Sequence, residues 1–291
     1  MKACWMIGIC FGFAALSNGP AWGAETARRF ALVIGNNAGG PPAEDLRYAE
    51  DDARKVAAVL EELGGYRPSD VTVIKGAQAD AVRQAFMRIT RKVQAAHEQG
   101  FHATLLVYYS GHARGGELWM NGSRLPLSEL RERLHQAPAD VRIGIVDACE
   151  AGNLTRLKGG RRGPSFLFES DDSTPARGLI LIGSSAVDEA SQESDELGGS
   201  FFTHYLTSGL RGDADESGEG RVTLAEVYDY AYHRTVAMTA GTRSGPQHPT
   251  YRFDLEGQAD VVLTDVSQGR SGLVFVAPVA GRYLVVDRAR G

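Results

Sequence analysis

One thiol and one imidazole in this chain stand directly after apolar runs, where enzymes often place reactive groups. Cys149 follows the run over residues 141–146, and His112 follows the run over residues 104–109. A thiolate is a nucleophile, and a neighbouring imidazole can lower the pKa of the thiol and later protonate a leaving amine. Taken singly, a free cysteine is commonly a buried apolar side chain, and a histidine at a strand end is commonly structural. Taken together, the two residues predict nucleophilic catalysis at a shared site.

The apolar runs that carry these residues belong to an alternating pattern of short strands and longer helices. The pattern predicts strands at residues 30–34, 71–74, 104–109, 141–146 and 179–182, and helices at residues 46–63, 80–99, 128–136 with Ser128 as the cap, 201–210 and 224–240. Such alternation predicts a mostly parallel sheet covered on both faces. If their strands are neighbours, His112 and Cys149 lie side by side at the carboxyl edge of the sheet. The backbone amides of Gly111 and Cys149 are then candidate donors to an oxyanion.

The N-terminal segment has the order of a secretory signal. A charged residue precedes an apolar stretch over residues 5–16, and small residues follow. We expect a signal peptide over residues 1–23, with an uncleaved amphipathic anchor as the alternative. Cys4 and Cys10 fall in this segment, so the mature chain keeps Cys149 alone and can form neither an internal disulfide nor a cysteine zinc site. The expected protein is exported, periplasmic or secreted, and free of the membrane after cleavage.

Length and composition favour one α/β domain followed by a small appendage. Residues 24–257 carry the alternating pattern, and residues 258–291 carry short runs typical of β-structure at 261–263, 273–276 and 283–286. A formal charge of −5 without a basic face argues against nucleic-acid binding. The motifs of nucleotide enzymes and of α/β serine hydrolases do not occur. Peptides or proteins are therefore the expected partners.

Five short segments occur in the order typical of the caspase and metacaspase family of cysteine peptidases. They are FALVIGNN at residues 30–37, LRYAEDDA at 46–53, YYSGHA at 108–113, DACEAG at 147–152 and GSSA at 183–186. Over residues 29–257 the chain resembles the bacterial caspase-like, peptidase C14 branch. The resemblance implies an α/β, caspase-like three-layer sandwich with a mostly parallel central sheet flanked by helices. It also implies a catalytic dyad of His112 and Cys149, with no cofactor required for the chemistry.

The chain departs from the metacaspase pattern beside both reactive residues. Ala113 stands where a second glycine is usual, and Glu150 and Ala151 stand where a His–Ser pair is usual. The two dyad residues are 37 positions apart, against roughly 50 in animal caspases. Two alternatives to a metacaspase-type enzyme stay open: a catalytically inactive caspase-like module that binds or scaffolds in response to calcium, and a peptidase of the gingipain or clostripain type.

Two carboxylates match the family's specificity pocket. In metacaspases an acidic pocket accepts Arg or Lys before the scissile bond, and the positions that match its carboxylates are Asp52 and Asp147. A carboxylate recognises a guanidinium through paired, charge-assisted hydrogen bonds. The alternative is that Asp51 and Asp52 simply begin a solvated helix face. The resemblance implies a specificity for basic residues.

A long polar segment follows Cys149. Residues 153–178 begin with four basic residues, Arg156, Lys158, Arg161 and Arg162, at the place where related enzymes separate their large and small subunits. A basic specificity makes these residues candidate sites of self-processing. A basic surface loop with no such role is the alternative.

Residues 215–226 match an EF-hand calcium loop. Oxygen ligands are expected from the side chains of Asp215, Ser217, Glu219 and Glu226 and from the carbonyl of Arg221, with a glycine at the sharp turn. An acidic turn that binds no metal is the alternative. Calcium is the one cofactor that the sequence suggests.

Overall fold

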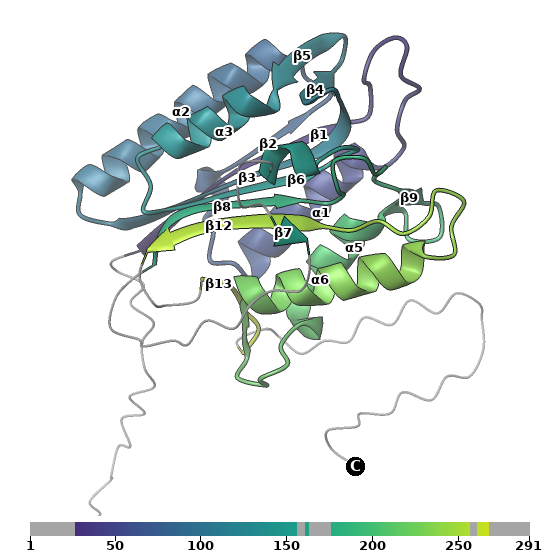
Figure 1. Cartoon of the computed structure of the whole chain (residues 1–291). Coiled ribbons are helices and arrows are strands. Elements are labelled where there is room, and N and C mark those ends of the chain that lie inside the picture. Colours follow the sequence, from purple (N-terminus) through teal and green to yellow (C-terminus); the bar gives the residue numbers. More distant parts are fainter. Residues whose placement is uncertain (1–26, 156–160, 163–175, 257–260, 268–291) are drawn as a thin grey trace, which may run out of the picture.

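A central sheet organises the residues that the computed structural model describes, which are 27–155, 161–162, 176–256 and 261–267 (Figure 1). Its strands, in sheet order, are β2 (Val71–Lys75), β1 (Ala27–Asn36), β3 (His102–Arg114), β6 (Val141–Asp147), β8 (Arg177–Gly183), β12 (Thr250–Glu256) and β7 (Arg161–Arg162). The first five run parallel, β12 is antiparallel to β8, and β7 is antiparallel to β12. The mostly parallel sheet predicted from the alternating pattern is confirmed.

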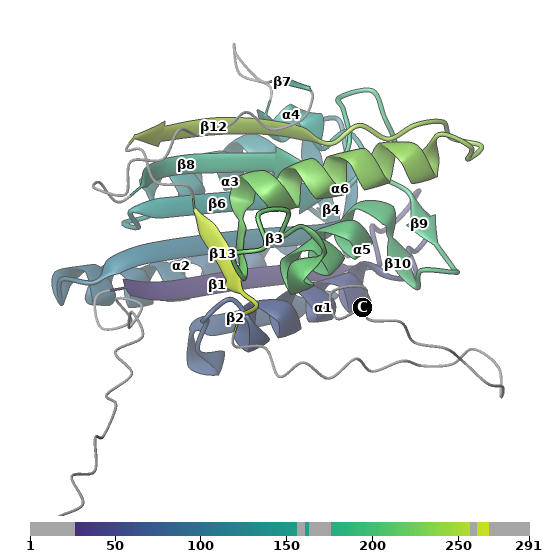
Figure 2. The ribbon, with the colours of Figure 1, turned by 90° about the horizontal axis from the view of Figure 1, so that it is seen from below.

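Helices cover both faces of the sheet and complete three layers. One face carries α2 (Ala79–Glu98) and α3 (Leu127–Gln136), and the other carries α1 (Ala49–Glu62), α5 (Phe201–Ser208) and α6 (Leu224–Thr239). Figure 2 shows the strands in order, with α1, α5 and α6 lying across the near face. No described helix is long and apolar enough to cross a membrane.

Strand β1 illustrates why the sheet is buried on both sides. Phe30 and Leu32 pack into the core beneath α2 and α3, whereas Ala31 and Val33 pack into the core beneath α1, α5 and α6. Each of the four side chains is fully buried. A continuous apolar run, rather than an alternating one, is what a strand with two covered faces requires.

Several short elements were not predicted, because none is long enough to show a periodic pattern. They are β4 (Glu117–Met120), β5 (Ser123–Pro126), α4 (Gly152–Thr155), β9 (Glu193–Ser194), β10 (Gly199–Ser200), β11 (Arg221–Thr223), a 3-10 turn at Pro68–Asp70 and a π-helical turn at Gly209–Asp213. By contrast, β13 (Val262–Asp265) overlaps the run predicted at residues 261–263. The end of β3 continues beyond its parallel neighbours and pairs antiparallel with β4, which in turn pairs with β5. Strand β9 pairs with β10.

Two details of the predicted elements differ from the structure. The expectation that Ser128 caps α3 is wrong, because the helix begins at Leu127 with Pro126 in the capping position and no side-chain cap. The run at residues 261–263 forms β13, which pairs with β11 and accepts hydrogen bonds from the Arg29 guanidinium at 3.1 Å through the carbonyls of Val262 and Leu263. This part of the expected appendage therefore packs on the main body. The other tail runs and the expected signal peptide lie outside the described residues.

Candidate active site

The register of β3 and β6 brings His112 and Cys149 to one edge of the sheet. Ser110 of β3 pairs with Asp147, the last residue of β6, and His112 and Cys149 each follow two positions after that pair. His112 and Cys149 line the same small cleft, together with Gly111 and Asp147. The neighbouring strands on which the predicted shared site depends are thus present.

The His112 imidazole is fixed through its backbone and by close packing. The Tyr109 hydroxyl donates to the carbonyls of His112 at 2.9 Å and Trp119 at 3.2 Å, which clamps the start of the β3–β4 hairpin. Gly39 lies so near the ring that a Cβ there would stand 2.7 Å from Cδ2. The buried Nε2 has no hydrogen-bond partner among the described residues. The ring is held in place, yet this nitrogen is not committed to a structural hydrogen bond.

The Cys149 thiol is half-buried, in surroundings that favour its protonated form. Its Sγ donates to the carbonyl of Ser191 at 3.9 Å. Burial raises the pKa of the thiol above its ordinary value, and the charges of Asp147 and Glu150 raise it further. A thiol in this setting becomes a nucleophile only when a neighbouring base removes its proton.

Glu150, one of the departures from the family pattern, ties the Cys149 loop to the His112 hairpin. Its backbone lies in the left-handed region at φ 55°. Its amide donates to the carbonyl of Glu189 at 3.0 Å, and its carboxylate accepts from the amide of Gly115, in the turn after β3, at 2.8 Å. The side chain therefore links the two loops that carry the dyad.

Replacing Glu150 separates the charge of this side chain from its role as a link. Glu150→Gln keeps an oxygen that can accept from Gly115 but removes the negative charge, so the pKa of Cys149 falls and alkylation by iodoacetamide shifts to lower pH. Glu150→Ala removes both the charge and the link, and we expect the same pH shift with a lower catalytic rate. An unchanged alkylation profile in Glu150→Gln would contradict this role.

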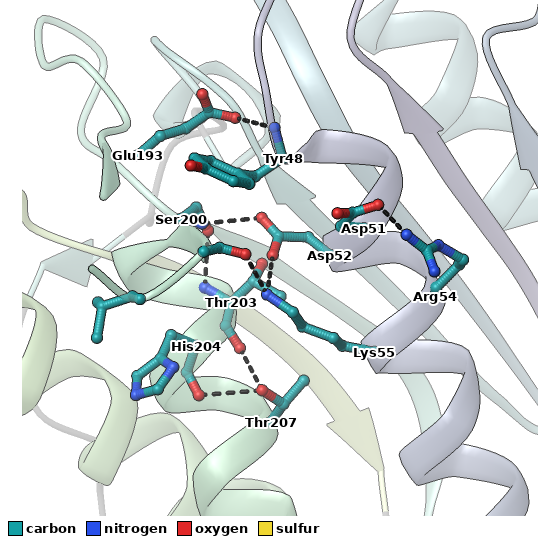
Figure 3. A network of polar contacts seen from close by, with 12 residues as sticks. Tyr48, Asp51, Asp52, Arg54, Lys55, Glu193, Ser200, Thr203, His204 and Thr207 are labelled. Carbon is teal, nitrogen blue, oxygen red and sulfur yellow. Dashed lines mark hydrogen bonds and ion pairs between the residues drawn. The ribbon is translucent and has the colours of Figure 1, made fainter. Parts of the chain in front are cut away.

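Asp147 forms the floor of the cleft and is saturated by hydroxyl donors. It is 3% exposed and accepts from Ser191 Oγ at 2.6 Å, from Thr203 Oγ1 at 2.6 Å and from Ser200 Oγ. Asp52 is fully buried and accepts from the Ser200 amide at 2.9 Å (Figure 3). Burial, and after it the charge of Asp147, raises the pKa of Asp52 to about 7. The structure thus places the two predicted pocket carboxylates together, joined by Ser200.

The β9–β10 hairpin supplies one wall of the cleft and is held on α1 by charge. Glu193 accepts from the backbone amides of Arg47 at 3.1 Å and Tyr48 at 2.9 Å, which satisfies amides just before the helix. Asp195 pairs with the Arg47 guanidinium at 3.0 Å and accepts from the Tyr48 hydroxyl at 2.8 Å. Both Glu193 and Leu46 line the cleft. Contacts between this hairpin and the residues just before α1 therefore shape this side of the cleft.

A buried glutamine positions the segment that faces Cys149. Gln247 is fully buried, donates to the carbonyl of Ser184 at 2.8 Å and accepts from the amide of Gln192 at 3.0 Å. It also donates to Ser191 Oγ at 3.3 Å. Sequence reasoning did not identify Gln247, Ser191, Ser200 or Glu193, because they lie in irregular segments or two-residue strands and no motif marks them.

The oxygens of the expected calcium loop are engaged within the turn. Asp215 accepts from Ser217 Oγ at 3.2 Å and from the amide of Gly220 at 2.9 Å. Glu219 pairs with the Arg221 guanidinium at 2.8 Å. Glu226 instead completes the capping box at the start of α6. No group of three or more His, Cys, Asp and Glu side chains in the described ranges is arranged to hold a metal. Calcium binding by this loop stays a prediction.

The expected processing residues are only partly described. Arg161 and Arg162 form β7, which pairs with Thr250 and Tyr251 of β12 at the edge of the sheet. Arg156 and Lys158 lie outside the described residues.

Comparison with known proteins decides the family. A family model described as the caspase domain, of peptidase C14, matches residues 28–258. The chain belongs to the caspase domain family. The fold of this caspase domain is similar to the crystal structure of caspase-1 from Spodoptera frugiperda, with 14% identity and a TM-score of 0.57, over 84% of this chain and 92% of that one. No curated protein matches the chain.

Membership in this family implies a type of reaction for the cleft. Caspase domains of peptidase C14 are cysteine peptidases, so peptides or proteins are the substrates that the family implies. The similarity to the insect caspase shows the fold alone.

Proposed function

We propose that this caspase domain is a cysteine endopeptidase that cleaves after Arg or Lys, with Cys149 as nucleophile and His112 as acid and base. The observation that carries the proposal is that both residues share one cleft with the buried carboxylate of Asp147. Arg and Lys are the side chains that a buried carboxylate favours, whereas an acidic side chain would be repelled by it.

The reaction follows the chemistry of a thiol and an imidazole. His112 removes the proton from Cys149, and the thiolate attacks the carbonyl carbon of the peptide bond. The amides of Gly111 and Cys149 are the proposed donors to the oxyanion that forms. The imidazolium then protonates the leaving amine as the C–N bond breaks. A water molecule, deprotonated by the same imidazole, hydrolyses the thioester and restores the thiol.

The same specificity supports self-processing after Arg156, Lys158, Arg161 or Arg162. For cleavage after Arg161 or Arg162, β7 has to leave the edge of β12 first, because a bound substrate must be extended and accessible.

Export through a signal peptide over residues 1–23 stays part of this proposal. Sequencing the N-terminus of the secreted or periplasmic protein tests it.

Fluorogenic peptides with Arg, Lys or Asp before an aminomethylcoumarin group test the proposed function. We expect the protein to cleave the Arg and Lys substrates but not the Asp substrate, and Cys149→Ala to cleave none of them. Parallel assays with calcium and with a chelator test whether calcium contributes. Cleavage of the Asp substrate alone would contradict the specificity. A protein that cleaves none of the three, with and without calcium, would favour the inactive binding module.

A further inference from the structure

A single cation serves the two buried carboxylates beside the cleft. Among the described residues, Lys55 is the one basic residue with an ion pair to either Asp52 or Asp147, and its Nζ lies 3.2 Å from Asp52 Oδ1. Figure 3 shows the ammonium group between α1 and the segment that leads into α5. Asp52 is thus paired with a positive charge that the protein itself provides, and Asp147 is joined to Asp52 through Ser200.

Lys55 reaches this position from the surface. Its side chain is 39% exposed, and its Nζ also donates to the carbonyl of Gly198 at 2.6 Å. Gly199 packs so closely that a Cβ there would stand 2.5 Å from Asp52 Oδ1 and 2.6 Å from the Lys55 ammonium. Ser200, the next residue, bonds Asp52 through its amide and Asp147 through its hydroxyl. The cation is therefore close to the pocket floor without lining the cleft.

We propose that Lys55 is the built-in counter-cation of this acidic pair and that it determines how tightly the cleft binds a basic substrate side chain. The inference rests on the proposed function, since it concerns the same pocket. A positive charge held near the carboxylates repels a second cation that enters the cleft at Asp147. When Lys55 is removed, the substrate cation is the only positive charge that the carboxylates attract.

The effect depends on pH because Asp52 can take up a proton in place of the lysine. Asp52, with a pKa raised to about 7 by burial and by Asp147, is made more acidic by Lys55. Without Lys55 the pKa of Asp52 rises further, so between about pH 7 and that higher pKa a proton taken up by Asp52 replaces part of the lost charge. Above both pKa values the pair stays ionised, and the site is one charge more negative than in the wild type. Other ionisable groups near these residues are Tyr108 of β3, which interacts with both carboxylates, and His204 of α5, which interacts with Lys55. His112, Cys149 and Glu193 line the cleft with Asp147.

Lys55→Met and Arg54→Met form a matched pair of variants. Arg54 precedes Lys55 on α1 and pairs with the exposed Asp51, also three positions away. With an Arg substrate we expect Lys55→Met to lower KM about fivefold at about pH 9, to lower it less at about pH 7.5, where a proton on Asp52 replaces part of the lost charge, and to leave kcat unchanged at both. Arg54→Met should match the wild type throughout. Lys55→Arg keeps the charge and should keep the wild-type KM.

Two readouts keep the inference distinct from the proposed function. Binding of argininamide to the Cys149→Ala protein, measured by calorimetry, should tighten by the same factor when Lys55→Met is added. A wild type that cleaves after Arg, with Lys55→Met behaving like Arg54→Met at both pH values, overturns the role of Lys55 alone. So does a fall in kcat with unchanged KM, which would indicate a structural role. A wild type that neither cleaves after Arg nor binds argininamide overturns the proposed function as well.

Discussion

Replacing His112 by alanine is expected to lower kcat/KM for an Arg substrate by at least about 10³-fold. The reason lies in the surroundings of Cys149, where burial and two carboxylates raise the pKa of the thiol above its ordinary value. At neutral pH such a thiol carries very little thiolate unless a base accepts its proton. A double variant with Cys149→Ala should be no less active than Cys149→Ala alone, because the two residues act as one unit.

Alkylation of Cys149 measured against pH tests this pairing without a substrate. The wild-type protein should react at neutral pH through a thiolate and imidazolium pair, whereas His112→Ala should react only as the pH rises toward the raised pKa of the isolated thiol. His135→Ala, a change at an exposed histidine on α3, is the control and should follow the wild type. Identical profiles for His112→Ala and the wild type would show that the imidazole does not activate the thiol.

The main strands and helices could be predicted because each buries a long apolar face. The run at residues 30–34 is apolar at every position, which indicates a strand covered on both sides, and β1 is such a strand. The pair β9 and β10 could not be predicted, because each strand has two residues and neither has a periodic pattern. Their position depends on contacts between Glu193 and the amides before α1, about half the chain away.

The two candidate reactive residues could be named from the sequence, and the residues that support them could not. Cys149 and His112 could be identified from residue type and from their place after apolar runs. Ser200 and Gln247 act through hydrogen bonds to side chains and carbonyls that lie far from them in sequence. Lys55 resembles any helical surface lysine until its ammonium group is found beside a buried carboxylate. Tertiary contacts, rather than local pattern, give these residues their roles.

Asp147→Asn is expected to remove most of the preference for basic substrates while the protein stays folded. Asparagine keeps the size and one acceptor oxygen of aspartate, so the hydroxyls of Ser191, Ser200 and Thr203 can reorient around it. The charge that attracts a guanidinium is lost, and kcat/KM for an Arg substrate should fall about 100-fold. Asp147→Ala should instead destabilise the fold by about 3 to 5 kcal/mol, because it leaves three hydroxyls without their shared acceptor.

Asp147→Asn should also raise the reactivity of the Cys149 thiol while it lowers cleavage after Arg. This difference separates an effect on specificity from an effect on the chemistry. The charge of Asp147 raises the pKa of Cys149 and that of Asp52, so its removal lowers both. Cys149 in this variant should therefore be alkylated at lower pH than in the wild type, even though cleavage after Arg is lost. If thiol reactivity and cleavage after Arg both fall, the substitution damages the dyad itself. If cleavage after Arg is retained, the charge of Asp147 is not required for recognition, and another carboxylate binds the basic side chain.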